Sequence, residues 1–162
     1  MPDGTQSGNR PPGKLRFGVV GESIASGTDW LDHVRRVEDA GVDTLLVRDH
    51  FAAGAFGQQL APFAALASAA AVTTRLRVGT MVLSNDFRHP VLVAHEAASI
   101  HQLSGGRFEL GLGAGWYEPE YAAAGLVFDP PRRRIDRLEE ALTSSRGCSP
   151  ATRYITPDRR TG

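Results

Sequence analysis

The sequence predicts an α/β fold built from parallel strand–helix units. Short apolar runs typical of strands begin near residues 15, 43, 76 and 108, which is about 30 residues apart. Each run is followed by a segment with helical character, and this alternation is typical of parallel βαβ units with right-handed crossovers. Two architectures remain open on this evidence, an open doubly wound sheet and part of an eight-stranded β/α barrel.

The first unit combines a strand over residues 15–20 (LRFGVV), ending at Gly21, with a helix that starts at about Thr28. Threonine is a favourable N-cap because its hydroxyl can accept from a free backbone N–H, and Gly41 is a suitable helix stop. The predicted apolar face of this helix carries Leu31, Val34, Val37 and Ala40.

The next two units follow the same pattern. Residues 43–47 (DTLLV) predict the second strand, and the alanine-rich residues 61–72 predict a helix that tolerates Pro62 in its first turn. Residues 76–83 (LRVGTMVL) predict the third strand. A third helix is expected from Pro90 to about Leu103, before the glycines that end it.

The fourth unit comprises a strand over residues 108–112 (FELGL) and a helix whose clearest part is residues 135–142. The domain organisation follows from the flanking composition. Residues 1–14 are expected to be a disordered lead, and residues 15–142 the folded domain. Residues 143–162 lack an amphipathic period and are predicted to be an irregular tail unrelated to the domain.

Bulk composition argues against several classes of partner. The 162 residues carry 18 Lys plus Arg and 18 Asp plus Glu, so no net charge favours nucleic acid or an anionic membrane. No apolar run approaches the length of a membrane span. The single cysteine, Cys148, excludes an internal disulfide and favours a reducing compartment, so we expect a soluble, cytoplasmic protein.

The segments after the predicted strands carry the candidate chemistry, because ligands collect at the carboxyl ends of parallel strands. His50 directly follows the second strand, beside Asp49. An imidazole can exchange a proton near neutral pH, and a neighbouring carboxylate can fix its tautomer. The alternative reading is that Asp49 and His50 only cap the following loop.

The other histidines are weaker candidates. His89 precedes Pro90 at a predicted helix entrance, where it could equally make a hydrogen bond that fixes the loop. A metal site formed by Asp49, His50 and His89 is an open alternative, although no tight ligand spacing supports it. His95 and His101 lie within the third predicted helix, where surface or packing roles are expected.

The fourth strand leads into a glycine-rich segment with Gly111, Gly113 and Gly115. It is not a GxGxxG dinucleotide fingerprint, because Trp116 stands where a glycine is required. Small residues here would let a flat ring or a phosphate approach the backbone, although a tight turn explains one or two of them.

Three larger side chains follow these glycines. Trp116 and Tyr117 could stack on an aromatic ligand or cover apolar core. Glu120 is expected to have a buried structural role, binding backbone groups of the loop.

Three segments together resemble the luciferase-like monooxygenase superfamily. LSGGRFELGLGAGWYEPEY is similar to that superfamily's pattern LSxGRxxLGxGxGWxxxE, and LLVRDHF resembles its strand ending in an acidic residue and histidine. LRVGTMVLSNDFRHPVLVAHEAASIHQLSGGR resembles its Gly-Thr and His-Pro pattern. The segments agree in order and spacing, and the resemblance covers about residues 15–142.

The resemblance implies a TIM barrel with about four of its eight strands present, and two-electron chemistry on a bound cofactor. NDFRHP and AGLVFDPPRRRIDRLEEAL look most like the F420-dependent subgroup (LLM class), so coenzyme F420 is expected, with FMN as the alternative. The resemblance places His50 beside the ring as a catalytic residue and Asp49 as the residue that orients it. It places a non-proline cis peptide at Met81-Val82, behind the ring. The full set of expected cofactor-binding residues is Met81, Val82, Ser84, Gly113, Ala114, Gly115 and Trp116.

The sequence also departs from the family. Trp116 replaces the glutamate general acid of deazaflavin dehydrogenases that oxidise glucose 6-phosphate, which favours a reductase or monooxygenase role on another small-molecule substrate. A frameshift or premature stop is one explanation for the tail and the missing second half. Three further hypotheses stay open: a homodimer or separate C-terminal half that completes the site, a non-catalytic fragment, and a metal-dependent TIM-barrel hydrolase.

Overall fold

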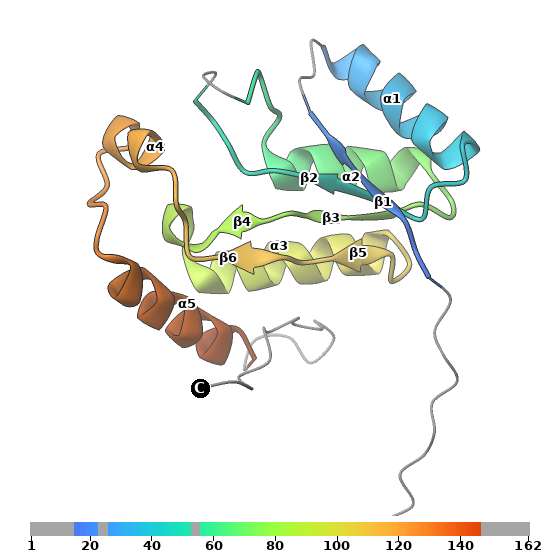
Figure 1. Ribbon diagram of the computed structural model, residues 1–162. Coiled ribbons are helices and arrows are strands. Elements are labelled where there is room, and N and C mark those ends of the chain that lie inside the picture. Colours follow the sequence, from blue (N-terminus) through green and yellow to red (C-terminus); the bar gives the residue numbers. More distant parts are fainter. Residues whose placement is uncertain (1–14, 23–25, 53–55, 147–162) are drawn as a thin grey trace, which may run out of the picture.

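The structure is a computed structural model, and it describes residues 15–22, 26–52 and 56–146. A four-stranded sheet has the order β1-β2-β3-β5, and every neighbouring pair is parallel. Its strands are β1 (Gly18–Gly21), β2 (Thr44–Val47), β3 (Arg77–Thr80) and β5 (Phe108–Glu109). A second parallel pair, β4 (Leu83–Ser84) and β6 (Leu112–Gly113), lies beyond β3 and β5 along the chain (Figure 1). The predicted α/β class with parallel strands is confirmed.

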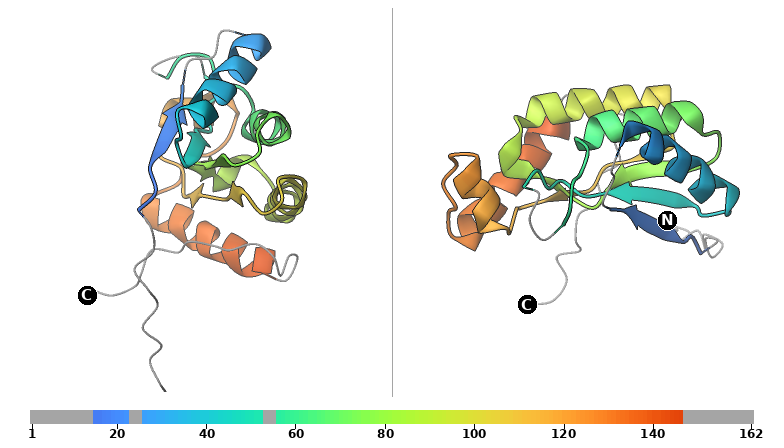
Figure 2. Two further views of the ribbon diagram at one scale, coloured as in Figure 1. Left: turned by 90° about the vertical axis from the view of Figure 1, so that its right-hand side faces the viewer. Right: turned by 90° about the horizontal axis from the view of Figure 1, so that it is seen from above.

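Three helices cover the same face of this sheet, as Figure 2 shows. They are α1 (Gly27–Asp39), α2 (Pro62–Val72) and α3 (Pro90–Leu103). A doubly wound sheet would place helices on both faces, so this one-sided layer is the arrangement of a barrel wall. The opposite face corresponds to the inside of a barrel.

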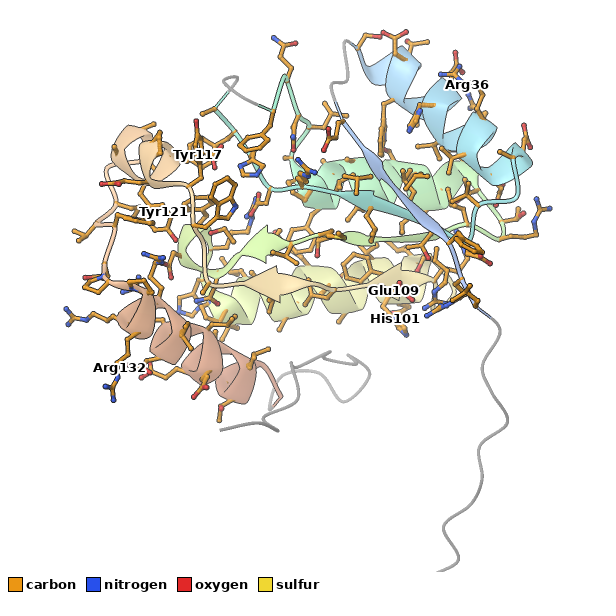
Figure 3. All side chains as sticks on the ribbon, viewed as in Figure 1. Arg36, His101, Glu109, Tyr117, Tyr121 and Arg132 are labelled. Carbon is orange, nitrogen blue, oxygen red and sulfur yellow. The ribbon has the colours of Figure 1, made fainter. Side chains whose placement is uncertain are left out.

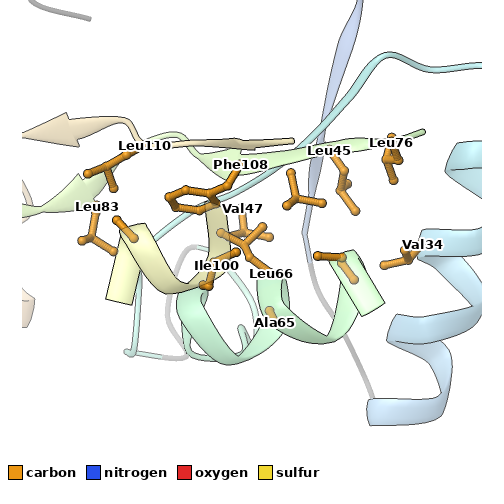
Figure 4. Close-up of a cluster of buried hydrophobic side chains, with 14 of the residues drawn as sticks. Val34, Leu45, Val47, Ala65, Leu66, Leu76, Leu83, Ile100, Phe108 and Leu110 are labelled. Carbon is orange, nitrogen blue, oxygen red and sulfur yellow. The ribbon is translucent and has the colours of Figure 1, made fainter. Parts of the chain in front are cut away.

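The core lies between this sheet face and the helices (Figure 4). Leu45, Val78 and Phe108 occupy positions in register on three neighbouring strands, and all three side chains are buried. Helix α2 contributes Ala65 and Ala69, which are at most 2% exposed. Their small side chains let α2 pack closely between α1 and α3, which explains the alanine-rich sequence.

Two predicted strands are interrupted in the structure. The expected strand over residues 76–83 is divided into β3 and β4, and the expected strand over 108–112 into β5 and β6. Between them Thr80 Oγ1 donates to the Gly111 carbonyl at 2.8 Å and accepts from the Gly111 N–H at 2.9 Å. A side chain thus replaces the backbone ladder at this point. The Met81-Val82 peptide is cis, as the resemblance implied.

The helix boundaries required three corrections. Ser26, not Thr28, caps α1, because its hydroxyl accepts from the Asp29 N–H at 3.1 Å. A short helix α4 (Glu118–Ala123) follows the glycine-rich segment and was not predicted. Helix α5 (Pro131–Arg146) is longer than residues 135–142 and extends into the segment expected to be irregular. The remainder of that tail, the lead over residues 1–14 and Cys148 lie outside the described residues.

Candidate functional site

A cavity of about 290 Å³ lies at the carboxyl ends of β2 and β4 and beside the segment after β6. Seven of the nine residues expected at the site line it, namely Asp49, His50, Met81, Val82, Ser84, Gly115 and Trp116. Gly113 and Ala114 do not line it, but both contact residues that do. Parallel strands therefore bring three distant segments of the sequence to one cavity, which is where this architecture places ligands.

His50 is held in this cavity by a buried glutamate. Its Nδ1 lies 3.0 Å from Glu120 Oε2, and the Glu120 side chain is only 1% exposed. Glu120 Oε1 also accepts from the backbone N–H groups of Phe51 and Ala52, at 2.9 and 3.0 Å. The expectation that Glu120 is buried and binds loop backbone is confirmed, and its contact with His50 was not anticipated.

Aromatic rings enclose the imidazole. Phe56 stacks on His50 with ring centroids 4.0 Å apart and planes 14° from parallel. Trp116 and Tyr117 meet His50 edge-on, with centroids 6.2 and 6.0 Å away. The rings fix the plane of His50 and surround it with apolar surface, so a flat aromatic ligand would find stacking partners here. Figure 3 shows Tyr117 and Tyr121 at the α4 end of the molecule.

Asp49 contacts a different partner from the one expected. Its carboxylate pairs with the Arg88 guanidinium through two hydrogen bonds, one of them 2.9 Å long, and accepts from the Ser84 N–H at 2.9 Å. The carboxylate that binds His50 is that of Glu120. Asp49 and His50 are adjacent in sequence, but successive residues of an extended chain point to opposite sides. The Asp49 carboxylate therefore positions Ser84 and Arg88, whereas the expected role was to orient His50.

Positions 113 and 115 leave no room for a side chain. A Cβ at position 113 would lie 2.5 Å from Val82 Cγ2, and one at position 115 would overlap the Tyr121 hydroxyl. Gly115 also has φ +77°, which favours glycine. Nearby, the buried Ser84 Oγ has no hydrogen-bond partner among the described residues. Glycine backbone beside a free hydroxyl suits the polar edge of a flat ring, so these residues fit a flavin or deazaflavin.

A charged network supports the cavity from the side of α5. Asp86 accepts from Arg137 Nε and Nη2 at 3.0 and 2.7 Å and from the Tyr121 hydroxyl at 3.0 Å. Burial raises the pKa of Asp86, but the hydrogen bonds from Arg137 and Tyr121 outweigh it, so the net shift is downward. Burial and the bond to Asp86 raise the pKa of Tyr121.

Because of this network, the free energy of unfolding should change with pH in the acid range. Because the pKa of Asp86 lies below its ordinary value of 3.8, its contribution is complete above that pH and disappears as the pH falls through the lowered pKa. We expect Asp86→Asn to destabilise the protein at pH 7, and the difference from wild type to shrink steadily below about pH 4. Urea unfolding from pH 7 to pH 3 measures this. The exposed Asp136→Asn is the control, and a difference that stays constant with pH would contradict the assignment.

The other histidines lie away from the cavity. His89 is the N-cap of α3 and accepts from the Val91 N–H at 3.3 Å, so its role as a loop-fixing residue fits the geometry. His89 lines a separate open groove next to α5. His95 is exposed and His101 partly exposed on α3. Within the described ranges, no group of three or more His, Cys, Asp or Glu side chains could hold a metal ion.

Sequence reasoning missed several residues that line the cavity, namely Arg48, Phe56, Phe87, Tyr117, Glu120 and Tyr121. Glu120 lies 70 positions from His50, and no local pattern indicates their contact. From the sequence, Tyr117 is expected only to stack on a ligand or cover apolar core, and Glu120 only to have a structural role. A usable signal was the sequence Glu-Pro-Glu over residues 118–120, which is typical of a helix start and would have predicted α4.

A family model for luciferase-like monooxygenases matches residues 11–157, so the chain belongs to the luciferase-like monooxygenase family. Its match extends beyond the 15–142 range of the motifs at both ends.

Relatives within this family differ in cofactor and reaction. The chain is 36% identical over 129 residues to a 4-hydroxyprotoasukamycin monooxygenase of Streptomyces nodosus subsp. asukaensis, covering 77% of this chain and 32% of that protein. It is 37% identical over 123 residues to an F420-dependent glucose-6-phosphate dehydrogenase of Intrasporangium calvum, covering 73% and 37%. An FMNH(2)-dependent dimethylsulfone monooxygenase of Pseudomonas fluorescens is 32% identical over 137 residues, covering 80% and 37%. The chain thus spans about a third of the length of these relatives.

A solved structure of an F420-dependent secondary alcohol dehydrogenase, in complex with an F420-acetone adduct, superposes with a TM-score of 0.72. It is 25% identical, and the match covers 81% of this chain and 41% of that one. Such neighbours support the partial-barrel reading of the parallel strands. None of the helices in the described parts of the chain has the length and apolar character needed to cross a membrane.

Proposed function

We propose that this chain supplies the His50 side of a flavin- or deazaflavin-dependent oxidoreductase site that acts on a small organic molecule. The observation that carries the proposal is the joint lining of one cavity by His50, Ser84 and the segment ending at Gly115 and Trp116. Membership of a family with F420- and FMN-dependent relatives supports it. When bound, the cofactor supplies two-electron chemistry.

The residues proposed to hold the cofactor ring are those of its expected binding set. Met81 and Val82 would support one face of the ring, and Ser84 would offer its free hydroxyl to a polar ring atom. Residues 113–115 would approach with bare backbone, since a Cβ at 113 or 115 would collide with neighbouring side chains. Trp116 is the remaining stacking partner.

His50 is proposed as the residue that exchanges a proton with the substrate. With Nδ1 bound to Glu120, only Nε2 remains for a ligand. The cavity walls are otherwise mainly apolar and include five aromatic rings, which favours a substrate with an apolar body and one hydroxyl or carbonyl group. The cation that lines the cavity, Arg48, is already paired with Glu22 at 2.8 Å, so a phosphate group on the substrate is not favoured.

Coenzyme F420 is the proposed cofactor and FMN the alternative, because relatives of comparable identity use each. The exposed Met81, Val82 and Trp116, which are 46–64% exposed, would be covered by the proposed completing half of the barrel. Covering these side chains would raise cofactor affinity by enclosing the ring.

A binding titration tests the proposal on the chain as it stands. We expect F420, or failing that FMN, to quench tryptophan fluorescence with a Kd on the order of tens of micromolar, a binding free energy of about 6 kcal/mol. Trp116→Phe keeps an aromatic ring but removes the local reporter, so its quenching should be much weaker, leaving the response of buried Trp30. Absence of binding by both cofactors would reject the proposal and favour a non-catalytic fragment.

A further inference from the structure

We propose that Glu120 is the positioning residue for His50, and that it selects the tautomer with the proton on Nδ1 and the lone pair of Nε2 free for the ligand. This assignment concerns the tautomer of the His50 imidazole and follows from the geometry. Its importance for the reaction rests on the function proposed above. A sequence-adjacent residue, Asp49, was the expected partner, but its carboxylate is committed to Arg88 and Ser84.

The two oxygens of Glu120 have separate tasks. Oε1 accepts from the backbone N–H groups of Phe51 and Ala52, and Oε2 faces His50 Nδ1. The two backbone bonds therefore fix how the carboxylate is turned. Because the side chain is 1% exposed, water does not compete for either oxygen.

This arrangement determines where the imidazole proton lies. An ionised carboxylate only accepts hydrogen bonds, so the ring nitrogen facing it must be the donor. Neutral His50 then carries its proton on Nδ1 and leaves Nε2 as an acceptor. No hydrogen bond within the described part of the chain reaches Nε2, and His50 lines the cavity.

Stacking completes the positioning. Phe56 lies on the imidazole with planes 14° from parallel, so the ring cannot rotate freely about the Nδ1 contact. Two constraints, one in the plane and one on the face, hold Nε2 in one direction. At that atom His50 can take a proton from a substrate hydroxyl, or return it, without moving its partner.

The test exchanges one atom of the partner. In Glu120→Gln the amide oxygen can still accept from Phe51 and Ala52, and the amide NH₂ then faces His50 Nδ1 as a donor. The reverse amide orientation would oppose two backbone donors and is disfavoured. Nδ1 must now accept, so the proton should move to Nε2. Glu118→Gln, an exposed change on the same helix, is the matched control.

Long-range ¹H–¹⁵N spectra of the imidazoles measure the tautomer without any cofactor, and a His50→Gln sample identifies the His50 signals among the five histidines. We expect the Nδ1–H form in wild type and Glu118→Gln, and the Nε2–H form in Glu120→Gln. The inference is wrong if wild type shows the Nε2–H form, or if Glu120→Gln leaves the tautomer unchanged. Near-ultraviolet circular dichroism, sensitive to Trp116 and Tyr117, confirms that the variant keeps its fold.

The outcome separates this inference from the proposed function. A tautomer exchange in a protein that binds neither F420 nor FMN would reject the function and leave the assignment of Glu120 intact. Cofactor binding with an unchanged tautomer would reject the assignment alone. If both hold, turnover should fall at least about 10-fold in Glu120→Gln, by analogy with the losses seen when the partner of a metal-ligating histidine is removed.

Discussion

Gly115→Ala is expected to lower the free energy of unfolding by about 2–5 kcal/mol and to abolish ligand binding in the cavity. A left-handed backbone costs alanine about 1–2 kcal/mol, and overpacking adds about 1–3 kcal/mol. Both penalties apply because φ is +77° and the new Cβ would overlap the Tyr121 hydroxyl. Urea unfolding measures the first effect, with wild type and variant fitted to the same dependence of free energy on urea concentration. The cofactor titration measures the second.

Gly41 offers a matched control for this substitution. It has the same φ of +77°, but no atom lies within 4 Å of the position that a Cβ would take. Gly41→Ala should therefore show the backbone penalty alone and leave ligand binding unchanged. Adding Tyr121→Phe to Gly115→Ala should recover part of the loss by removing the hydroxyl. Equal losses for the two alanine variants would contradict the contact with Tyr121.

Asp49→Ala is expected to lower the free energy of unfolding by about 2–4 kcal/mol. Removing one partner of a buried ion pair costs about 3–5 kcal/mol, and the value is discounted here because Arg88 is 26% exposed. The Ser84 N–H also loses its acceptor. Chemical unfolding measures the loss, and the His50 tautomer should stay as in wild type.

Two comparisons sharpen this prediction. Asp32→Ala removes a partner from the Asp32–Arg35 pair, whose side chains are about half exposed, and should cost at most about 1 kcal/mol. Arg88→Met combined with Asp49→Ala leaves no unpaired charge and should recover part of the stability. If Asp49→Ala is as stable as wild type but changes the His50 tautomer, then Asp49 orients His50 as the sequence first indicated.

The fold class could be predicted from the sequence because strands and helices alternate at regular intervals. The Pro90 helix was placed correctly over 90–103, since Pro marks its start and glycines follow its end. The breaks at Thr80 and Gly111 do not follow from the local sequence pattern, although the resemblance implied the cis peptide at Met81-Val82. Those breaks depend on a hydrogen bond between side chain and backbone across the sheet.

The position of the candidate site could be predicted from the sequence, but the pairing of its charged side chains could not. Residues at strand ends must meet at one edge of a parallel sheet, so Asp49, His50, Ser84 and Gly115 were brought together as expected. Which carboxylate contacts which base depends on α4, a helix of six residues whose start signal is short. Helix α4 delivers Glu120 to His50, and Asp49 turns away to Arg88.

The sheet order has one more consequence. Strands β1 and β5 stand at the two margins of the four-stranded sheet, and among the described residues no strand pairs with their outer sides. Their outward N–H and C=O groups are templates for another extended chain. Self-association of the protein should therefore rise with concentration through backbone pairing at these margins, and a complementary chain that adds strands there would suppress it.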